Sequence, residues 1–363
     1  MKQIKVFAFP SHSAKGHSSG VDYARVNQPM KFLNGYKDKD TEFKVDLWCG
    51  DPISLQAWSS LVKKYDLVYF NYTVNDWAFA AMGSMVRKEG KKMIMDLDDA
   101  LWLMNSDNVV YETYKKGSKG LNIVTDIINE VDAVTCTNSY LRNVIANYTH
   151  KRHDQIGIMP NYIDLELYNS IPKPRESPFI NIVHYGSSTH FRDLKSFGFV
   201  GGVDRIMADY PNARFITIGS FFSDFKMKWG ERYEEEFGHL EFIKWAKERF
   251  PETMEKTDIF VAPLEENNYN KAKSDIKRLE VATAKKPFIG QDIRQYRESI
   301  TDGVDGMLAG NADDWYLKIK TLIDDPELRK KIGEEGYKRM ARDKQMKDHI
   351  QEYADFFKKV LTK

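Results

Sequence analysis

Residues 268–290 read NYNKAKSDIKRLEVATAKKPFIG, and the apolar run DIFVAP precedes them at residues 258–263. This pattern predicts a short buried strand over residues 259–262, a loop over 263–270, and a helix that begins with Ser274 as its N-cap. Such a junction points free backbone N–H groups and the positive end of the helix dipole at the space above the strand's carboxyl end. That space suits a phosphate group.

Charged side chains surround the same junction. Lys271, Lys273 and Lys277 add positive charge around the opening, and Asp275 lies in the first helical turn. Glu280 comes about one and a half turns further on, where it reaches a ribose hydroxyl without facing the phosphates. We therefore predict a diphosphate cradle with a carboxylate for the sugar; the alternative is a solvated helix face with Glu280 on the surface.

The order of these residues resembles the donor-site motif of retaining GT-B glycosyltransferases, in a branch similar to glycosyltransferase family 4. That motif matches Pro263, Leu264, Asn270, Lys273, Ser274, Asp275, Lys277, Glu280 and Pro287. The resemblance implies an α/β protein with two Rossmann-like, doubly wound parallel-sheet domains that face a cleft. It also implies that the segment binds a nucleoside-diphosphate sugar, through Lys271, Ser274, Asp275, Lys277 and Glu280.

The chain has 363 residues, enough for two domains with separate cores. We expect an acceptor-binding domain over residues 1–170 and a nucleotide-sugar-binding domain over 171–340, joined at the Pro-rich, charged stretch 171–178. By resemblance, residues 341–363 form a helix that packs back towards the first domain.

The formal net charge of +1 gives no overall field that would indicate nucleic acid or an anionic membrane as a partner. Two distant cysteines, Cys49 and Cys136, fit reduced core thiols better than a disulfide framework. No apolar stretch approaches the roughly 18 residues of a transmembrane helix, and the short apolar run before Pro10 is no signal peptide. We therefore expect a cytoplasmic protein without stable membrane insertion.

Apolar and β-branched runs alternate with helical patterns, which predicts parallel sheets covered on both faces. In the first domain, strands are predicted at residues 5–9, 42–48, 67–71, 92–95, 133–137 and 156–159. In the second, they are predicted at 179–185, 214–218, 241–243, 259–262 and 288–290, with helices over 313–324 and 326–363. By resemblance alone, the loop that reads the base lies near Lys244 and Trp245.

Three carboxylates, Asp96, Asp98 and Asp99, follow the fourth predicted strand. As an Asp-x-Asp motif they would hold a divalent ion that bridges the donor's phosphates, as in the GT-A fold. The GT-B branch also carries an Asp-x-Asp-Asp here, which favours carboxylates on the acceptor side and no metal. Capping of a helix by Asp98 or Asp99 is the third interpretation.

Two segments that follow strands complete the predicted cleft: a helix expected over residues 21–33 with the loop before it, and a loop in the second domain. After the first strand, the family pattern matches Gly20, Tyr23, Arg25 and Pro29. Two interpretations of Arg25 follow: it contacts a phosphate or the acceptor, or it lies on a helix surface and packs its aliphatic stem there. After the first strand of the second domain, Gly186, Ser187, Thr189 and His190 resemble the family's diphosphate loop, and Arg192 supplies charge for the leaving phosphate. Ser187 stands where many relatives have Arg; Asp193 fits a helix cap.

The superfamily widely uses two glutamates eight residues apart. Glu280 is the second, and Ala272 stands at the first position. We therefore expect retention by front-face attack, in which the departing diphosphate accepts the acceptor's proton. Arg192 and Lys273 would stabilise the diphosphate, and Asp98 with its neighbours would orient the acceptor.

The predicted function is transfer of a sugar from a nucleoside-diphosphate donor, UDP-sugar favoured, without metal or cofactor. The acceptor expected by default is a glycan or lipid-linked sugar. A phage-type enzyme acting on hydroxymethylated pyrimidines in DNA is an alternative, although residues 1–165 have about as many acids as bases. A binding protein that keeps the nucleotide cleft without turnover is the other alternative.

Overall fold

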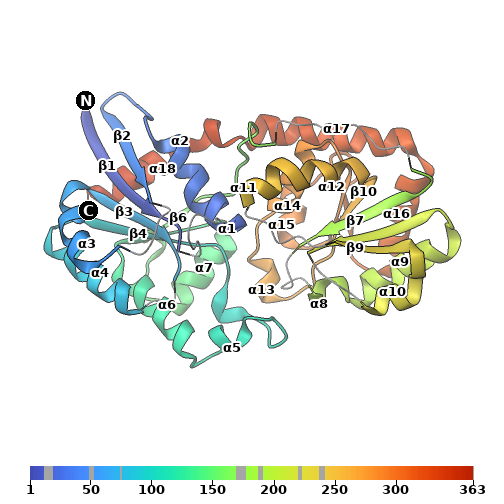
Figure 1. The fold of residues 1–363 in the computed structure, drawn as a ribbon, viewed down its shortest axis with the longest axis horizontal. Coiled ribbons are helices and arrows are strands. Elements are labelled where there is room, and N and C mark those ends of the chain that lie inside the picture. Colours follow the sequence, from blue (N-terminus) through green and yellow to red (C-terminus); the bar gives the residue numbers. More distant parts are fainter. Residues whose placement is uncertain are drawn as a thin grey trace.

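The structure is a computed structural model that describes residues 1–11, 19–48, 53–73, 76–168, 177–186, 191–219, 223–236 and 242–362. Figure 1 shows two halves side by side, each built around one sheet. The first six-stranded sheet is parallel throughout, in the order β2-β1-β3-β4-β5-β6. Its strands are β1 (Lys2–Phe9), β2 (Thr41–Leu47), β3 (Leu67–Asn71), β4 (Lys92–Leu97), β5 (Ala133–Cys136) and β6 (Ile156–Ile158).

The second six-stranded sheet is also parallel, in the order β12-β11-β10-β7-β8-β9. Its strands are β7 (Ile180–Tyr185), β8 (Ala213–Ile218), β9 (Tyr233–Glu236), β10 (Ile259–Ala262), β11 (Phe288–Gln291) and β12 (Met307–Ala309). Both sheets are the doubly wound α/β type that the alternation of strands and helices predicts.

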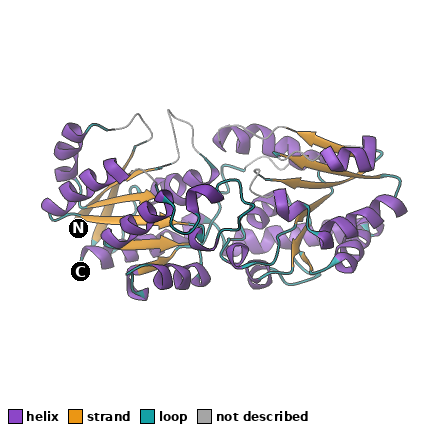
Figure 2. Cartoon of the chain, turned by 90° about the horizontal axis from the view of Figure 1, so that it is seen from below, coloured by secondary structure: helices purple, strands orange, loops and turns teal. Residues whose placement is uncertain are grey.

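Helices flank each sheet (Figure 2). In the first half they are α1 (Gly20–Asp22), the π-helical η1 (Tyr23–Asn27), α2 (Gln28–Leu33), α3 (Leu55–Leu61), η2 (Val62–Lys64), α4 (Asp76–Lys88), η3 (Leu101–Leu103), α5 (Tyr111–Tyr114), α6 (Lys119–Glu130), α7 (Ser139–Tyr148) and η4 (His153–Gln155). In the second half they are α8 (Phe191–Leu194), α9 (Phe197–Asp209), α10 (Ser223–Trp229), η6 (Gly230–Arg232), α11 (Phe242–Lys244), the π-helical η7 (Trp245–Arg249), α12 (Phe250–Lys256), α13 (Asn268–Lys271), α14 (Ile276–Thr283), α15 (Arg294–Ser299), α16 (Ala312–Asp324), α17 (Pro326–Asp343) and α18 (Met346–Leu361). In the described parts of the chain, no helix combines the length and apolar character needed to cross a membrane.

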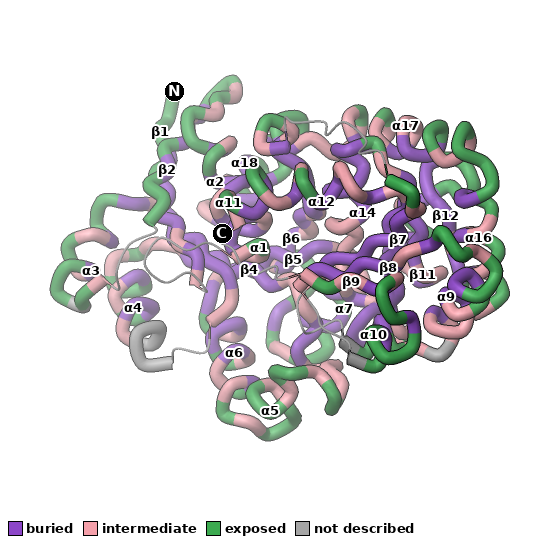
Figure 3. The backbone as a smooth tube through the Cα atoms, turned by 45° about the vertical axis from the view of Figure 1, so that its right-hand side comes forward, coloured by how far each residue is buried: buried purple, intermediate pink, exposed green. Residues whose placement is uncertain are grey.

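Each sheet separates two apolar cores, because successive side chains of a strand point to opposite faces. In β1, Phe7 belongs to one core while Val6 and Ala8 belong to the other. The strands are accordingly the most continuously buried part of the chain (Figure 3). Cys136 is a buried free thiol, as predicted, and Cys49 lies outside the described residues.

The C-terminal helix α18 packs on the first half of the molecule, whereas α17 runs along the second (Figure 1). The Phe356 ring lies against Gly157 of β6, where an added Cβ would come within 2.9 Å of the ring. Lys358 forms an ion pair with Asp38, and Phe357 is fully buried beside Tyr69, with ring centroids 5.3 Å apart. The predicted return of the C-terminal helix to the first domain is therefore confirmed.

Two predictions of secondary structure were wrong. A strand was expected over residues 241–243, but residues 242 and 243 belong to the helical turn α11, and residue 241 lies outside the described residues. Helix α11 leads into η7, where Trp245 packs on Tyr185 at 5.0 Å between ring centroids. One edge of the second sheet is formed by β9, which pairs with β8. Three of its four residues are glutamates, so it lacks the apolar pattern from which strands are predicted.

The single helix expected over residues 326–363 is divided into α17 and α18. Ile163 donates its N–H to the Lys344 carbonyl and accepts the Met346 N–H, at 2.8 and 2.9 Å. These two hydrogen bonds take the place of bonds within a helix. Helix α17 therefore ends before Lys344, and the chain enters the first half as α18. The domain boundary expected near residue 170 falls in 169–176, outside the described residues.

We expect Phe357→Ala to lower the free energy of unfolding of the first half by about 3–5 kcal/mol, because the change leaves a cavity beneath α18. Leu317→Ala is the matched control, since the Leu317 side chain is 53% exposed on α16 and its loss should change stability by about 0.5 kcal/mol or less. Urea unfolding measures both; equal effects of the two changes would contradict the docking of α18.

Candidate functional site

The predicted cradle is a compact loop between β10 and α14. The short helix α13 interrupts the expected loop and is capped by the Asn267 side chain, which accepts the Asn270 N–H at 2.8 Å. Helix α14 begins at Ile276 with Asp275 at its N-cap, so the prediction of Ser274 as the cap was wrong. The Ser274 hydroxyl instead accepts a hydrogen bond from the Asn161 amide of the first half, at 2.7 Å.

Glu280 is buried on one face of α14, with a relative exposure of 7%. Its carboxylate accepts hydrogen bonds from Tyr168 at 3.1 Å and from Tyr185, the last residue of β7, at 2.7 Å. Burial raises the pKa of Glu280, and the hydrogen bond from Tyr185 opposes that shift. The alternative of a solvated surface glutamate is therefore excluded, and the carboxylate is held ready to accept hydrogen bonds.

Lys277 lies near Glu280, and its ammonium is 5.9 Å from the centre of the Tyr185 ring. Burial lowers the pKa of Lys277 to about 8, although the Glu280 carboxylate opposes this shift. An anionic ligand beside Lys277 would therefore stabilise the charged form of its ammonium group.

Lys273 reaches across to the first half, where its ammonium lies 3.6 Å from Asp99. Although burial opposes it, three carboxylates raise the pKa of this ammonium: Asp99, Asp193 and Asp98. Tyr269 of α13 also donates to Asp99, at 3.0 Å. Lys273 and two of the three predicted aspartates, Asp98 and Asp99, therefore meet where the two halves face each other.

Arg192 also links the halves. Its guanidinium pairs with Asp107 of the first half and with Glu265 of the second, the latter at 2.6 Å. The neighbouring Asp193 is 4% exposed and accepts the Glu265 N–H and the Asn270 amide, both at 2.9 Å. Asp193 lies within α8 rather than at its cap, and these hydrogen bonds hold the β10–α14 loop.

Gly186 directly follows β7 and donates its N–H to the Ile218 carbonyl at 2.9 Å. Gly219 lies directly against it, with φ of +84°, and a Cβ there would come within 2.5 Å of the Gly186 carbonyl oxygen. Close backbone approach at this strand end thus requires glycine. Ser187, Thr189 and His190 lie outside the described residues, so their predicted contacts stay predictions.

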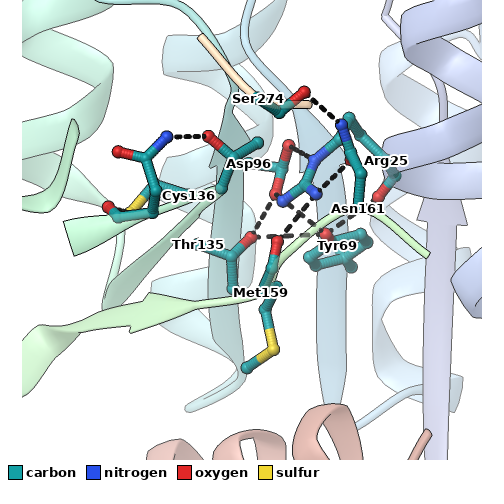
Figure 4. A network of polar contacts seen from close by, with 10 residues as sticks. Arg25, Tyr69, Asp96, Thr135, Cys136, Met159, Asn161 and Ser274 are labelled. Atoms are coloured by element: carbon teal, nitrogen blue, oxygen red, sulfur yellow. Dashed lines mark hydrogen bonds and ion pairs between the residues drawn. The ribbon is translucent and has the colours of Figure 1, made fainter. Parts of the chain in front are cut away.

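Arg25 and Asp96 form a buried ion pair, and neither side chain is more than 1% exposed. Arg25 donates to both Asp96 oxygens at 2.9 and 2.8 Å, and to the Met159 carbonyl and the Asn161 side chain, both at 2.8 Å (Figure 4). Thr135 donates to Asp96 at 2.6 Å. The acceptor contacts expected of Arg25 and Asp96 are therefore corrected: these groups are enclosed and satisfied within the first half.

Gly20 begins α1, whose first turn is closed by reciprocal hydrogen bonds between Ser19 and Asp22. The Tyr23 ring of η1 stacks on Phe242 of α11 at 4.8 Å. The loop expected on the acceptor side thus contacts the other half, beside the segment predicted to read the base.

Lys271 is the predicted donor residue that the structure separates from the others. Its ammonium pairs with Glu266 at 3.3 Å. Sequence reasoning missed the partners of the site: Tyr168 and Tyr185 around Glu280, and Asp107 and Glu265 around Arg192. Tyr185 comes directly before Gly186 in the sequence, and this position could have marked it as part of the site. Tyr168, Asp107 and Glu265 belong to no local sequence pattern that would have marked them.

Comparison with known proteins finds similarity in sequence and in fold. Residues 194–325 match the family model described as "Glycosyl transferases group 1". The chain is 22% identical over 264 residues to the putative teichuronic acid biosynthesis glycosyltransferase TuaH of Bacillus subtilis (strain 168), across 64% of this chain and 62% of TuaH. The chain therefore spans less than two thirds of the length of that relative.

Among solved structures, HepE of Anabaena in complex with UDP-glucose superposes with a TM-score of 0.66 at 12% identity, over 97% of this chain and 99% of HepE. Sucrose-phosphate synthase of Thermosynechococcus elongatus superposes with a TM-score of 0.62 at 13% identity, over 99% of both chains. At these identities the likeness is one of fold. The protein has the two-domain GT-B fold, and the match to the group 1 family supports a glycosyltransferase.

Proposed function

We propose that this protein transfers a sugar from a nucleoside-diphosphate donor to an acceptor hydroxyl. The observation that carries the proposal is the pairing on α14 of a buried carboxylate, Glu280, with a half-buried cation, Lys277, which lies in the first turn of the helix. A carboxylate suits ribose hydroxyls, and cations at a helix N-terminus suit a diphosphate. UDP is the favoured nucleotide, because HepE was solved with UDP-glucose.

The diphosphate would lie between Lys277, Lys273 and the end of β7 at Gly186. Arg192 would join it by exchanging a carboxylate partner for a phosphate oxygen, since its side chain is 52% exposed. Ser187, Thr189 and His190 follow Gly186 in sequence and are proposed to complete the loop around the phosphates, with backbone N–H groups near Ser274 and Asp275 on the other side.

We propose retention by front-face attack. The bond from the anomeric carbon to the diphosphate breaks, the acceptor oxygen bonds the same face, and the acceptor's proton passes to the departing diphosphate. Ala272 supports this route, because it is fully buried in the first core and brings no carboxylate to the sugar. Asp98 is the proposed orienting group for the acceptor, with Asp99 beside it.

No metal is part of the proposal. A divalent ion on the Asp-x-Asp pair would need Asp96, and that carboxylate is occupied by Arg25 and Thr135. Lys273, Arg192 and the helix terminus supply the positive charge that a metal would otherwise bring to the leaving group.

The proposed acceptor is a cell-envelope glycan or a lipid-linked precursor, encountered in the cytoplasm. TuaH, a putative teichuronic acid biosynthesis glycosyltransferase, supports this class. DNA with hydroxymethylated pyrimidines is the competing acceptor, and release of nucleoside diphosphate with each acceptor compares the two. No release with any acceptor would favour a binding protein.

We expect UDP to stabilise the intact protein against heat, by about 2.7 kcal/mol at a concentration 100-fold above its Kd. EDTA should leave the shift unchanged. Glu280→Ala should weaken UDP binding by about 10- to 100-fold, because hydrogen bonds to a charged group contribute about 1.5–3 kcal/mol. Glu335→Ala is the control, since Glu335 pairs with Lys338 on α17. A shift that requires a divalent ion would contradict the metal-free cradle.

Lys273→Gln should reduce kcat by about 10²- to 10³-fold with a smaller change in KM, because the ammonium stabilises charge that develops on the leaving diphosphate. Nucleoside-diphosphate release measures both constants. Lys338→Gln on α17 serves as the surface control. A rise in KM alone would show that Lys273 binds the donor without assisting its departure.

The lowered pKa of Lys277 predicts that the stability of the folded protein depends on pH. Its pKa is about 8 in the folded protein against an ordinary value of 10.5, so the folded state binds fewer protons than the unfolded state between these values. The free energy of unfolding should therefore rise with pH across that window, and Lys277→Gln should remove the rise.

Donor binding should show the opposite trend, because only the charged ammonium attracts the diphosphate. The donor KM should rise by about tenfold per pH unit above pH 8. Lys277→Arg, which stays charged, should keep KM flat. A wild-type KM that stays flat up to pH 9.5 would contradict this role of Lys277.

A further inference from the structure

A second cavity opens on the far side of α14. Its volume is about 390 Å³, within the range of small-molecule sites. It lies between the two halves, with Thr137, Asn138 and Asn161 from the first and Arg278, Arg294 and Lys344 from the second in its wall.

This cavity is separate from the proposed donor cradle. Asp275 and Arg278 are three residues apart and share one side of α14, whereas Lys277 and Glu280 lie on the opposite side. Asp275 and Arg278 line the cavity, and neither Lys277 nor Glu280 does. The two spaces therefore adjoin, and they share Lys273, Ser274 and Asp275, which line the cavity and also belong to the proposed cradle.

The wall of the cavity is cationic. Five basic side chains line it: Lys273, Arg278, Arg294, Arg339 and Lys344. Three carboxylates oppose them: Asp275, Glu298 and Asp343. Two of these three are already engaged, Glu298 with Arg294 and Asp343 with Arg342, both at 2.6 Å.

The strongest indication that this cavity binds an anion comes from Arg278. It is 2% exposed, and its Nε and Nη2 atoms have no hydrogen-bond partner among the described residues. Asp305 lies 3.7 Å from Nη2, too far for a hydrogen bond, and that carboxylate also accepts from Arg339. Nη2 of Arg294 is likewise unpartnered within the described chain. Unpartnered N–H donors on a buried guanidinium group such as that of Arg278 are costly, so an oxyanion that accepts hydrogen bonds from them is favoured.

We propose that this cavity binds a phosphate group, either inorganic phosphate or the phosphate of a small phosphorylated metabolite, as a second ligand beside the sugar donor. A phosphate offers several acceptor oxygens and up to two charges, which suits guanidinium groups arriving from α14 and α15 better than a carboxylate does. Because the walls belong to both halves, the bound phosphate also holds them together.

The test is isothermal titration of the intact protein with inorganic phosphate and, separately, with glucose 6-phosphate, at constant ionic strength set by chloride. We expect saturable binding of at least one. Arg294→Gln should weaken it by about tenfold or more, as the loss of a charged hydrogen bond implies. The matched control is Arg297→Gln on the same helix, since Arg297 pairs with Asp292 and does not line the cavity. Tighter binding of the sugar phosphate would identify a metabolite as the ligand, and equal binding the free ion.

Arg278→Gln should abolish phosphate binding. If this buried variant does not fold, the phosphate affinity of Arg294→Gln tests the proposal instead. Lys277→Gln distinguishes this cavity from the donor cradle. Loss of phosphate binding in Lys277→Gln with retention in Arg294→Gln would place the anion in the cradle and overturn the proposal. Absence of saturable binding to either probe would overturn it as well, while leaving the UDP experiment unaffected.

Discussion

The buried ion pair between Arg25 and Asp96 fixes the geometry on which the cleft depends. Both side chains are enclosed, and a lone charge there would cost about 3–5 kcal/mol, so each residue requires the other. The remaining Arg25 donors hold the Met159 carbonyl and Asn161, and Asn161 in turn donates to Ser274. A chain of polar contacts thus runs from β4 to the loop that starts α14, and it sets where that loop meets the first half.

Around this fixed point, cations at the cleft are held by carboxylates. Lys273 faces Asp99, and Arg192 faces Asp107 and Glu265. In the proposed function, a diphosphate would take the place of these carboxylate partners of Lys273 and Arg192. Such preorganisation is what electrostatic stabilisation of a leaving group requires, since charges that must be gathered during reaction contribute less.

The sequence predicts most of the strands and the helix α14 well because these are local patterns, whereas the role of that segment as a cradle stays a prediction. Apolar runs give strands, and Lys277 and Glu280 follow from helical spacing. The errors arose where distant partners decide the outcome. Ser274 does not cap α14, because Asn161 engages its hydroxyl, and Asp96 turns inward, because Arg25 lies beneath it. Neither partner is detectable from spacing along the chain, since each lies more than 70 residues away.

Helix α14 therefore presents two different faces near one terminus. Glu280 and Lys277 belong to the proposed donor side, and Arg278 belongs to the cationic cavity. Because the loop before α14 borders both spaces, an anion in one changes the electrostatic field and the loop position felt by the other. Thermodynamic linkage makes that coupling reciprocal: whatever factor the anion applies to donor affinity, the donor applies to anion affinity. Like charges oppose each other across the helix, whereas a ligand that holds the two halves together would favour binding of the other. The sign of the coupling thus reports which of these two effects is larger.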